Sequence, residues 1–189
     1  MRFNTQKAAM HKNSYIGVLP FLNTANSRER LLKLIDRYKV DFDVYLSSKG
    51  FNLQRPYVWS LKQKQELIYS ILRGVELPLL AAVNLTDDNG DNSEYLIIDG
   101  KQRLSSIFDF ARDKFSIKDL NGKDVLFSQF TTEEQFAFGQ SIGKIRVQIA
   151  QLSHSEITDD ALIEWFKFLN FAGTPQDEEH FNRLKKINT

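Results

Sequence analysis

The segment Tyr95-Leu96-Ile97-Ile98-Asp99-Gly100-Lys101-Gln102-Arg103-Leu104-Ser105-Ser106-Ile107-Phe108 changes from an apolar run to an amphipathic pattern at Asp99-Gly100. The first four residues have the β-branched and aromatic content of a buried strand. Leu104, Ile107, Phe108 and Ala111 then recur at helical spacing. The pattern predicts a strand that ends at Asp99 and a helix that begins just after Gly100.

A strand-to-helix turn of this kind is suited to binding an anion. Glycine permits close approach of the backbone to a ligand, and the first turn of a helix presents unpaired N–H groups and the positive end of its dipole. Arg103 lies in this turn, where a guanidinium can hold phosphate or carboxylate in a bidentate manner, with Gln102 beside it. The alternative is structural: Asp99 caps the helix, Gly100 eases the turn, and Arg103 is a solvated cation.

A second transition into a helix lies upstream, at Arg55-Pro56-Tyr57-Val58-Trp59-Ser60. Ser60 and Gln63 fit a capping box for a helix that ends near Gly74. Two rigid aromatic side chains and an arginine directly before a helix favour contact with a ligand. In the alternative interpretation, Tyr57 and Trp59 anchor the core and Arg55 is exposed.

Together these motifs resemble the N-terminal domain of GmrSD-type modification-dependent restriction systems, which is related to the ParB/sulfiredoxin fold. The resemblance rests on Gln54-Arg55-Pro56-Tyr57-Val58-Trp59, Ile71-Leu72-Arg73-Gly74, Leu77-Pro78-Leu79-Leu80, Ile98-Asp99-Gly100-Lys101-Gln102-Arg103-Leu104 and Leu169-Asn170-Phe171-Ala172-Gly173-Thr174-Pro175. It runs from about Gly50 to about Lys186. The family usually reads Asp-Gly-Gln-Gln-Arg, and this chain has Lys101 at the middle position.

The resemblance implies an α+β fold of the ParB/sulfiredoxin type, a small mixed sheet flanked by helices, in residues 47–189. Residues 1–46 form an N-terminal extension, a helix and a strand that cover the core. The resemblance also implies binding of a nucleoside triphosphate, with Mg²⁺ as a candidate companion ion. The catalytic positions are Asp99, Gln102 and Arg103, and the nucleotide-binding positions are Arg55, Tyr57, Trp59, Gly100, Lys101, Asn170, Gly173 and Thr174. No metal ligand is assigned.

Two functional hypotheses follow from the resemblance. In the first, the chain is a nucleotide-binding regulatory module of a DNA restriction system, with nucleoside triphosphatase activity that regulates cleavage of modified DNA. The histidine and asparagine pattern of the nuclease domain that usually follows is missing, so we expect a sensing module. In the second, Lys101 has silenced the chemistry, and the chain binds DNA or a partner nuclease to regulate or inhibit it.

The amino-acid composition excludes several other classes of protein and of site. The chain of 189 residues is 42% hydrophobic and 26% charged, which is ordinary for a globular protein of one substantial core. The formal net charge of +1 gives no global attraction to nucleic acid. The chain has no cysteine, which excludes disulfides, thiolate zinc sites and sulfiredoxin chemistry. No apolar run approaches a membrane-spanning length, so we expect a cytoplasmic protein.

Other local patterns predict the elements around the site. In the N-terminal part, Tyr15 to Leu22 fits one strand or an extended arm, Asn26 with Glu29 caps a helix, and Asp41 to Leu46 alternates as a strand. Leu77 to Leu85 reads as a buried strand. Hairpin signals stand at Asn89-Gly90 and Asn121-Gly122. An EF-hand at Asp87 to Asn92 is disfavoured, because position six would be Asn92 and position twelve Ile98.

The C-terminal third predicts three helices, a strand and a break between the last two helices. The last helix starts at Thr174-Pro175-Gln176-Asp177 and has an apolar stripe of Phe181, Leu184 and Ile187. Thr131 or Thr132 starts a short helix, and residues 144–152 alternate as a half-buried strand with Lys144, Arg146 and Gln148 on its polar side. An aromatic helix covers 159–169, with Trp165 in the core. The helix is expected to break at Asn170 to Gly173, which forms either a plain helix joint or a wall of the nucleotide pocket.

Overall fold

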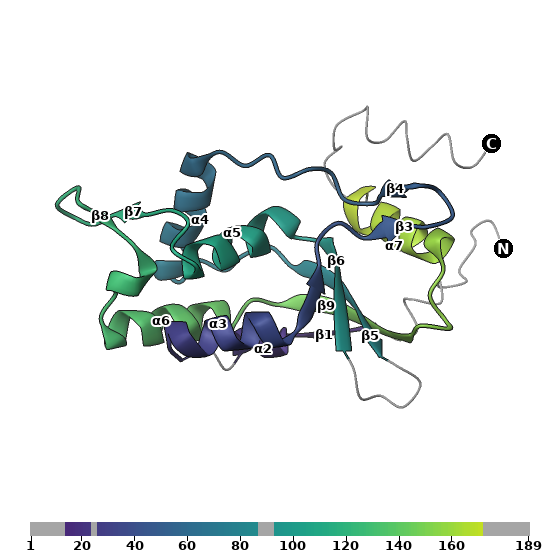
Figure 1. Ribbon diagram of the computed structural model, residues 1–189, viewed down its shortest axis with the longest axis horizontal. Helices are drawn as coiled ribbons and strands as arrows, with labels where there is room; N and C mark the ends of the chain where they lie inside the picture. Colours follow the sequence, from purple (N-terminus) through teal and green to yellow (C-terminus); the bar gives the residue numbers. More distant parts are fainter. Residues whose placement is uncertain (1–13, 24–25, 87–92, 172–189) are drawn as a thin grey trace.

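The computed structural model describes residues 14–23, 26–86 and 93–171, and its framework is a mixed sheet (Figure 1). The sheet has five strands in the order β1-β9-β5-β6-β2. The two central pairs differ in direction, since β5 runs parallel to β9 and antiparallel to β6. The strands are β1 (Ser14–Gly17), β2 (Lys39–Asp41), β5 (Leu80–Thr86), β6 (Ser93–Asp99) and β9 (Val147–Ser153).

Two layers cover the two faces of this sheet, so the protein has two cores. The first core lies under α2 (Pro20–Asn23), α3 (Arg28–Arg37), α4 (Leu61–Leu72), α5 (Lys101–Ala111) and α6 (Thr132–Ile142). The second core lies under α7 (Asp159–Phe171) and a hairpin of β3 (Tyr45–Leu46) and β4 (Phe51–Asn52). Figure 1 shows α2 to α6 gathered toward one end, with α7 beside the β3–β4 hairpin. The expected α+β class, a mixed sheet flanked by helices, is confirmed.

Strand β5 lies at the centre of the sheet and is buried on both faces because a layer packs on each of them. Leu80 and Ala82 enter the first core, whereas Ala81, Val83 and Leu85 enter the second. The strand begins at Leu80, three residues after the predicted start. This arrangement holds the end of β6, and therefore Asp99, between two packed layers.

The prediction of a half-buried strand over residues 144–152 is wrong in its faces. Strand β9 begins at Val147, and its neighbours are β1 on one side and β5 on the other. Val147 and Ile149 enter the first core, while Ala150 and Leu152 enter the second. Because both faces of the sheet are covered, each face of β9 contributes apolar residues to a core, although Gln151 is exposed, so the expected single apolar side does not exist.

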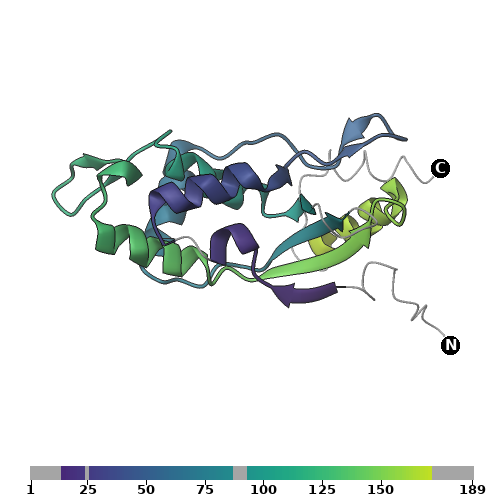
Figure 2. The same cartoon turned by 60° about the horizontal axis from the view of Figure 1, so that its bottom comes forward.

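The N-terminal residues extend the sheet at both of its edges. Strand β1 pairs with β9, and β2 pairs with β6 (Figure 2). Leu19, Phe21, Leu31 and Ile35 belong to the first core. Residues 14–46 thus supply strands as well as cover, and the domain boundary at residue 46 stays a prediction.

Three N-terminal predictions are corrected. Ser27, and not Asn26, caps α3, since its side chain accepts a hydrogen bond from the Arg30 N–H. Asp41 to Leu46 is not one strand, because the Asp41 carboxylate accepts hydrogen bonds from the Asp43 and Val44 N–H groups and turns the chain there. The stretch from Tyr15 to Leu22 also divides, into β1 and α2.

Other local signals are confirmed. Ser60 and Gln63 form the predicted capping box of α4, and Thr131 caps α6. The Asn121-Gly122 signal lies between β7 (Ile117–Lys118) and β8 (Asp124–Val125), which pair as a projecting hairpin (Figure 1). A short 3-10 helix, η1 (Phe127–Gln129), follows it. The Asn89-Gly90 signal and the disfavoured calcium loop lie outside the described residues, although β5 and β6 pair antiparallel on both sides of it.

Helix α7 is longer than predicted. It continues through Asn170 to Phe171, so the expected break does not begin at Asn170. Leu169, the last residue of the predicted helix, packs against the second core, and the helix predicted from Thr174 onward lies outside the described residues. Trp165 is fully buried, as predicted. In the parts of the chain that the structure describes, no helix is both long and apolar enough to cross a membrane.

The contact between α4 and α5 predicts a dependence of stability on pH. Asp109 of α5 pairs with Lys64 of α4 at 3.0 Å and with Lys114 at 2.9 Å. Burial raises the pKa of the Asp109 carboxyl, but hydrogen bonds and charge from Lys114 and Lys64 outweigh it, so the pKa is lowered overall. An aspartate whose pKa is lower in the folded protein stabilises the fold when the pH is above its pKa in the unfolded chain, which is about 4. This stabilisation is lost as the pH falls through the pKa of the folded state.

We therefore expect Asp109→Asn to lower the free energy of unfolding by about 1–3 kcal/mol at neutral pH. The difference from wild type should shrink as the pH falls below about 4. Urea unfolding of the wild type and the variant at a series of pH values measures this difference in unfolding free energy. A difference that stays constant down to acid pH would show that Asp109 acts through packing and not through its charge.

Candidate functional site

The turn between β6 and α5 needs a glycine for two reasons. Gly100 has φ 104° and ψ 10°, in the left-handed region that other residues avoid. A Cβ built on Gly100 would also lie 2.3 Å from Leu80 Cδ2, inside any van der Waals contact. The glycine therefore lets α5 begin directly against the buried end of β5.

Helix α5 begins without a side-chain cap. Ser27, Ser60 and Thr131 each cap their helices by accepting an N–H hydrogen bond, but Gly100 occupies the corresponding position of α5 and makes no such bond. The alternative in which Asp99 caps this helix is therefore wrong. The first turn of α5 keeps its N–H groups and the positive end of its dipole for another acceptor.

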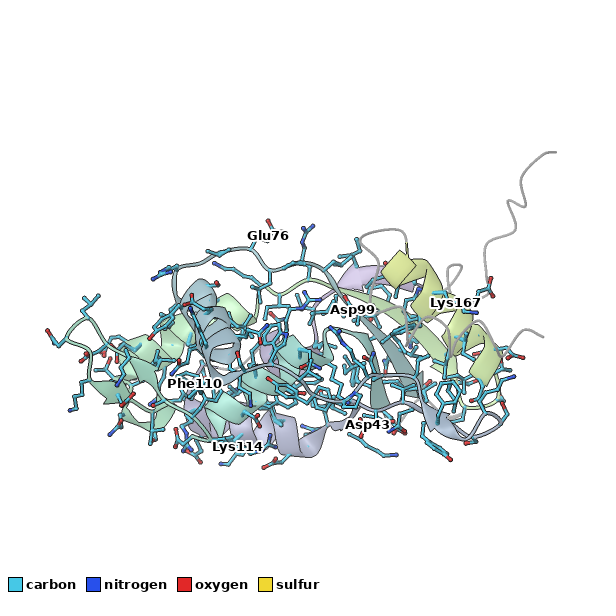
Figure 3. All side chains as sticks on the ribbon, turned by 90° about the horizontal axis from the view of Figure 1, so that it is seen from above. Asp43, Glu76, Asp99, Phe110, Lys114 and Lys167 are labelled. Atoms are coloured by element: carbon cyan, nitrogen blue, oxygen red, sulfur yellow. The ribbon has the colours of Figure 1, made fainter. Side chains whose placement is uncertain are left out.

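A cavity of about 130 Å³ lies at this end of α5. Its walls come from the β6–α5 turn, the segment before α4 and one side chain of α7: Gln54, Arg55, Trp59, Asp99, Gly100, Lys101, Gln102, Arg103 and Phe166. The structure thus brings together all the predicted site residues of the first two motifs except Tyr57. Figure 3 shows Asp99 near the middle of the long axis of the molecule.

Two glutamines hold the segment before α4 against the β6–α5 turn. The buried Gln54 amide donates hydrogen bonds to the Ile97 and Ile98 carbonyls at 2.8 and 2.5 Å. Gln102 Oε1 accepts from the Val58 and Trp59 N–H groups at 3.0 and 3.2 Å, and its Nε2 donates to the Pro56 carbonyl at 3.2 Å. Gln102, assigned to catalysis from the sequence, positions Arg55 and Trp59 in this structure.

Arg103 is also engaged inside the protein. One of its terminal nitrogens donates to Asp99 Oδ2 at 3.0 Å, and the other donates to the Pro78 carbonyl. Its side chain is 15% exposed and that of Asp99 is 38% exposed. Burial lowers the pKa of the Arg103 guanidinium, and the negative charge and hydrogen bond of Asp99 oppose this shift. Arg103 is therefore not the solvated cation of the alternative interpretation.

Lys101 pairs with a residue that sequence reasoning did not connect to the site. Its Nζ lies 2.5 Å from Asp43 Oδ1, and the Lys101 side chain is only 9% exposed. Asp43 lies in the turn between β2 and β3, well before the first motif. No local pattern marks this residue, because the contact joins positions 58 apart in the sequence.

Arg55 differs from the other two cations at the site. It is partly exposed, lines the cavity, and has no hydrogen-bond or ion-pair partner among the residues that the structure describes. Trp59 lines the same cavity and packs partly against the first core. Tyr57 instead directs its hydroxyl to Ser106 Oγ at 2.7 Å, with Lys64 Nζ 4.6 Å from its ring centre.

The structure does not show whether the third predicted motif, Asn170 with Gly173 and Thr174, reaches the cavity. Asn170 lies near the end of α7, and Gly173 and Thr174 lie outside the described residues. Phe166, one helical turn earlier, lies in the aromatic helix that the sequence predicted over 159–169, and it does line the cavity. Within the described ranges, no cluster of His, Cys, Asp or Glu is arranged to hold a metal ion.

Comparison with known proteins gives one match. The model of the family described as the GmrSD restriction endonuclease, N-terminal domain, matches residues 47–186. This range contains every predicted site residue and more than half of the chain. No curated protein and no solved structure matches the chain.

Proposed function

Since this chain belongs to the family of the N-terminal domain of the GmrSD restriction endonuclease, we propose that it binds a nucleoside triphosphate and thereby regulates a partner nuclease of a restriction system. The phosphates would lie in the cavity at the start of α5. The ParB/sulfiredoxin relationship of the fold remains part of this proposal.

The observation that carries the proposal is the guanidinium of Arg55, which has no partner among the described residues, beside the start of α5, which has no side-chain cap. Helix N-termini bind phosphate through their free N–H groups and dipole, and an arginine fork adds two charge-assisted hydrogen bonds. Gly100 leaves room for a phosphate to approach the backbone. The two features supply anion donors without breaking any hydrogen bond or ion pair that the structure records among the residues it describes.

Arg103 and Lys101, the other two cations at the cavity, do not bind phosphate in this proposal. Arg103 holds Asp99 and the Pro78 carbonyl, so it positions the turn, and Lys101 remains paired with Asp43 at the cavity wall. The phosphate contact that the sequence assigned to Arg103 passes to Arg55. A guanidinium without a partner among the described residues, together with helix N–H groups, suits the binding of one phosphate group.

Asp99 fits a role toward Mg²⁺ through its remaining oxygen. Oδ2 accepts from Arg103, whereas Oδ1 has no partner among the described residues. Mg²⁺ commonly binds one or two carboxylates together with substrate phosphates, so one carboxylate at a phosphate site suits it. The ion would supply charge neutralisation for the phosphates, and Asp99 would orient a water molecule there.

Arg55→Ala tests the phosphate site. We expect the affinity for triphosphate to fall about 10- to 150-fold, the range for hydrogen bonds to a charged group, without loss of the fold. Thermal-shift titration with ATP, GTP, CTP and UTP, with and without Mg²⁺, measures it; saturating ligand should stabilise the wild type by roughly 2.7 kcal/mol at a hundredfold excess over Kd.

Arg30→Ala is the matched control, because it removes the same charge from an exposed position on α3. Its affinity should equal that of the wild type. Arg55→Lys keeps the charge without the fork and should be intermediate. Unchanged affinity in a folded Arg55→Ala protein would contradict the proposed phosphate site.

A second candidate function is supported by the pairing within the signature turn. Lys101, Gln102 and Arg103 all have partners inside the protein, which favours binding without turnover. The chain would then be a catalytically silent module that binds DNA or a partner nuclease. Phosphate release lost in Asp99→Ala would support the hydrolase, and stabilisation without release would support the silent module.

A further inference from the structure

A second and larger cavity adjoins the first. Its volume is about 570 Å³, and it shares Gln54, Arg55 and Lys101 with the smaller cavity at the start of α5. Because these three residues belong to both walls, a ligand that occupied the two cavities would pass along Arg55 and Lys101. The phosphate-binding role already proposed leaves this larger space without a function.

Aromatic side chains from three separate segments line the larger cavity. Phe42 follows β2, Phe51 begins β4, and Tyr57 precedes α4. Phe42 is held edge-to-face against Phe108, with ring centres 5.6 Å apart, and Tyr57 is held by its hydrogen bond to Ser106. Rigid rings around a cavity of this size are suited to stacking on a planar heterocycle.

The polar part of the same wall is the Lys101–Asp43 ion pair. Lys101 is 9% exposed and Asp43 is 61% exposed, so the carboxylate is the more accessible partner. The position of Asp43 is fixed, since its N–H donates to Asp41 and its carbonyl accepts from the Gln54 N–H at 3.3 Å. The pair presents a hydrogen-bond donor beside an acceptor at a defined place.

This donor and acceptor pattern matches one kind of base edge. Guanine presents the O6 acceptor next to the N1–H and N2–H₂ donors, so Lys101 can donate to O6 while Asp43 accepts from the nitrogens. Adenine has the opposite order, with an amino donor next to the N1 acceptor. Adenine would therefore place its amino group against the ammonium of Lys101 and its ring acceptor against the carboxylate of Asp43.

We propose that the larger cavity is the nucleobase subsite of this protein and that Asp43 and Lys101 select guanine. The inference rests on the proposed triphosphate site, since the phosphates of the same ligand would occupy the smaller cavity. Asp43 lies outside the residues matched by the family, so the N-terminal part of the chain would set the base preference.

The experiment compares ligands with and without a base. Calorimetric titration of the full chain with tripolyphosphate, GTP, ATP and UTP separates the two cavities, because tripolyphosphate has no base. We expect GTP to bind roughly 5- to 150-fold more tightly than tripolyphosphate, the range for stacking of one base. ATP should bind more weakly than GTP, and UTP, which has the keto and N–H groups on a single ring, should lie between them.

Two variants test the residues. Phe51→Ala should reduce the affinity for GTP toward that for tripolyphosphate, and Asp43→Asn should reduce the preference for GTP over ATP. Neither variant should weaken binding of tripolyphosphate. Tyr45→Ala, at an exposed position on the same hairpin, is the control and should leave every affinity unchanged.

The outcomes distinguish the two proposals. If tripolyphosphate binds and depends on Arg55 but GTP shows no advantage over it, the base subsite is wrong and the phosphate site stands. If GTP and ATP bind equally tightly, the selection by Asp43 and Lys101 is wrong. If neither tripolyphosphate nor any nucleotide binds, the proposed function itself fails.

Discussion

Gly100→Ala is expected to destabilise the protein by about 2–5 kcal/mol, the sum of left-handed backbone strain and overpacking. The alanine Cβ would lie 2.3 Å from Leu80 Cδ2, and Leu80 is 3% exposed and held in the first core. Either Leu80 or the start of α5 must move, and both alternatives disturb the site. Urea unfolding followed by circular dichroism measures the change.

Gly122→Ala is the matched control for this substitution. Gly122 also has a positive φ, 78°, but a Cβ there has no neighbour within 4 Å, so strain alone should cost about 1–2 kcal/mol. A double variant with Leu80→Ala tests the clash directly. Leu80→Ala should cost clearly less in the Gly100→Ala background than in the wild type; equal costs would mean that the two residues do not collide.

Trp165→Ala is expected to cost about 3–5 kcal/mol of unfolding free energy, the range for loss of a large buried aromatic side chain. Trp165 is fully buried in the second core, where α7 packs on the sheet. The neighbouring Phe166 lines the smaller cavity, so loss of this packing should also reach the site. Denaturant unfolding measures the free energy, and nucleotide titration measures the effect on binding.

Trp165→Phe should cost much less than Trp165→Ala. The indole N–H of Trp165 is buried without a hydrogen-bond partner among the described residues, so its removal breaks no bond and relieves the penalty of burying a donor. Phe136→Ala, at a position that is 51% exposed on α6, is the surface control and should stay within about 0.5 kcal/mol. A cost for Trp165→Phe as large as that for alanine would show that the N–H is bonded in solution.

The sequence predicted the elements with strong local signals. The turn at Asp99-Gly100, the capping box at Ser60 and Gln63, the cap at Thr131 and the hairpin at Asn121-Gly122 each depend on residues within one or two turns of each other. Such signals act through local backbone geometry and hydrogen bonds, so they can be read without tertiary structure.

Predictions failed where a neighbouring layer changed the outcome. Strand β9 showed one apolar side in the sequence but is buried on both sides by β1, β5 and the two cores. The error on β9 came from contacts that a sequence window does not contain. Helix α7 also continued through Asn170, past the predicted break.

The sequence by itself determined the family, the α+β class and the strand-to-helix turn between β6 and α5, because these depend on short motifs and on local periodicity. The tertiary structure alone decided which charged side chains find partners among the described residues. Lys101 and Asp43 are 58 residues apart, and Gln54 and Ile97 are 43 apart, yet both pairs are in contact. Packing of the two layers around the sheet creates these contacts, and it leaves Arg55, unlike Arg103, without a partner among the described residues.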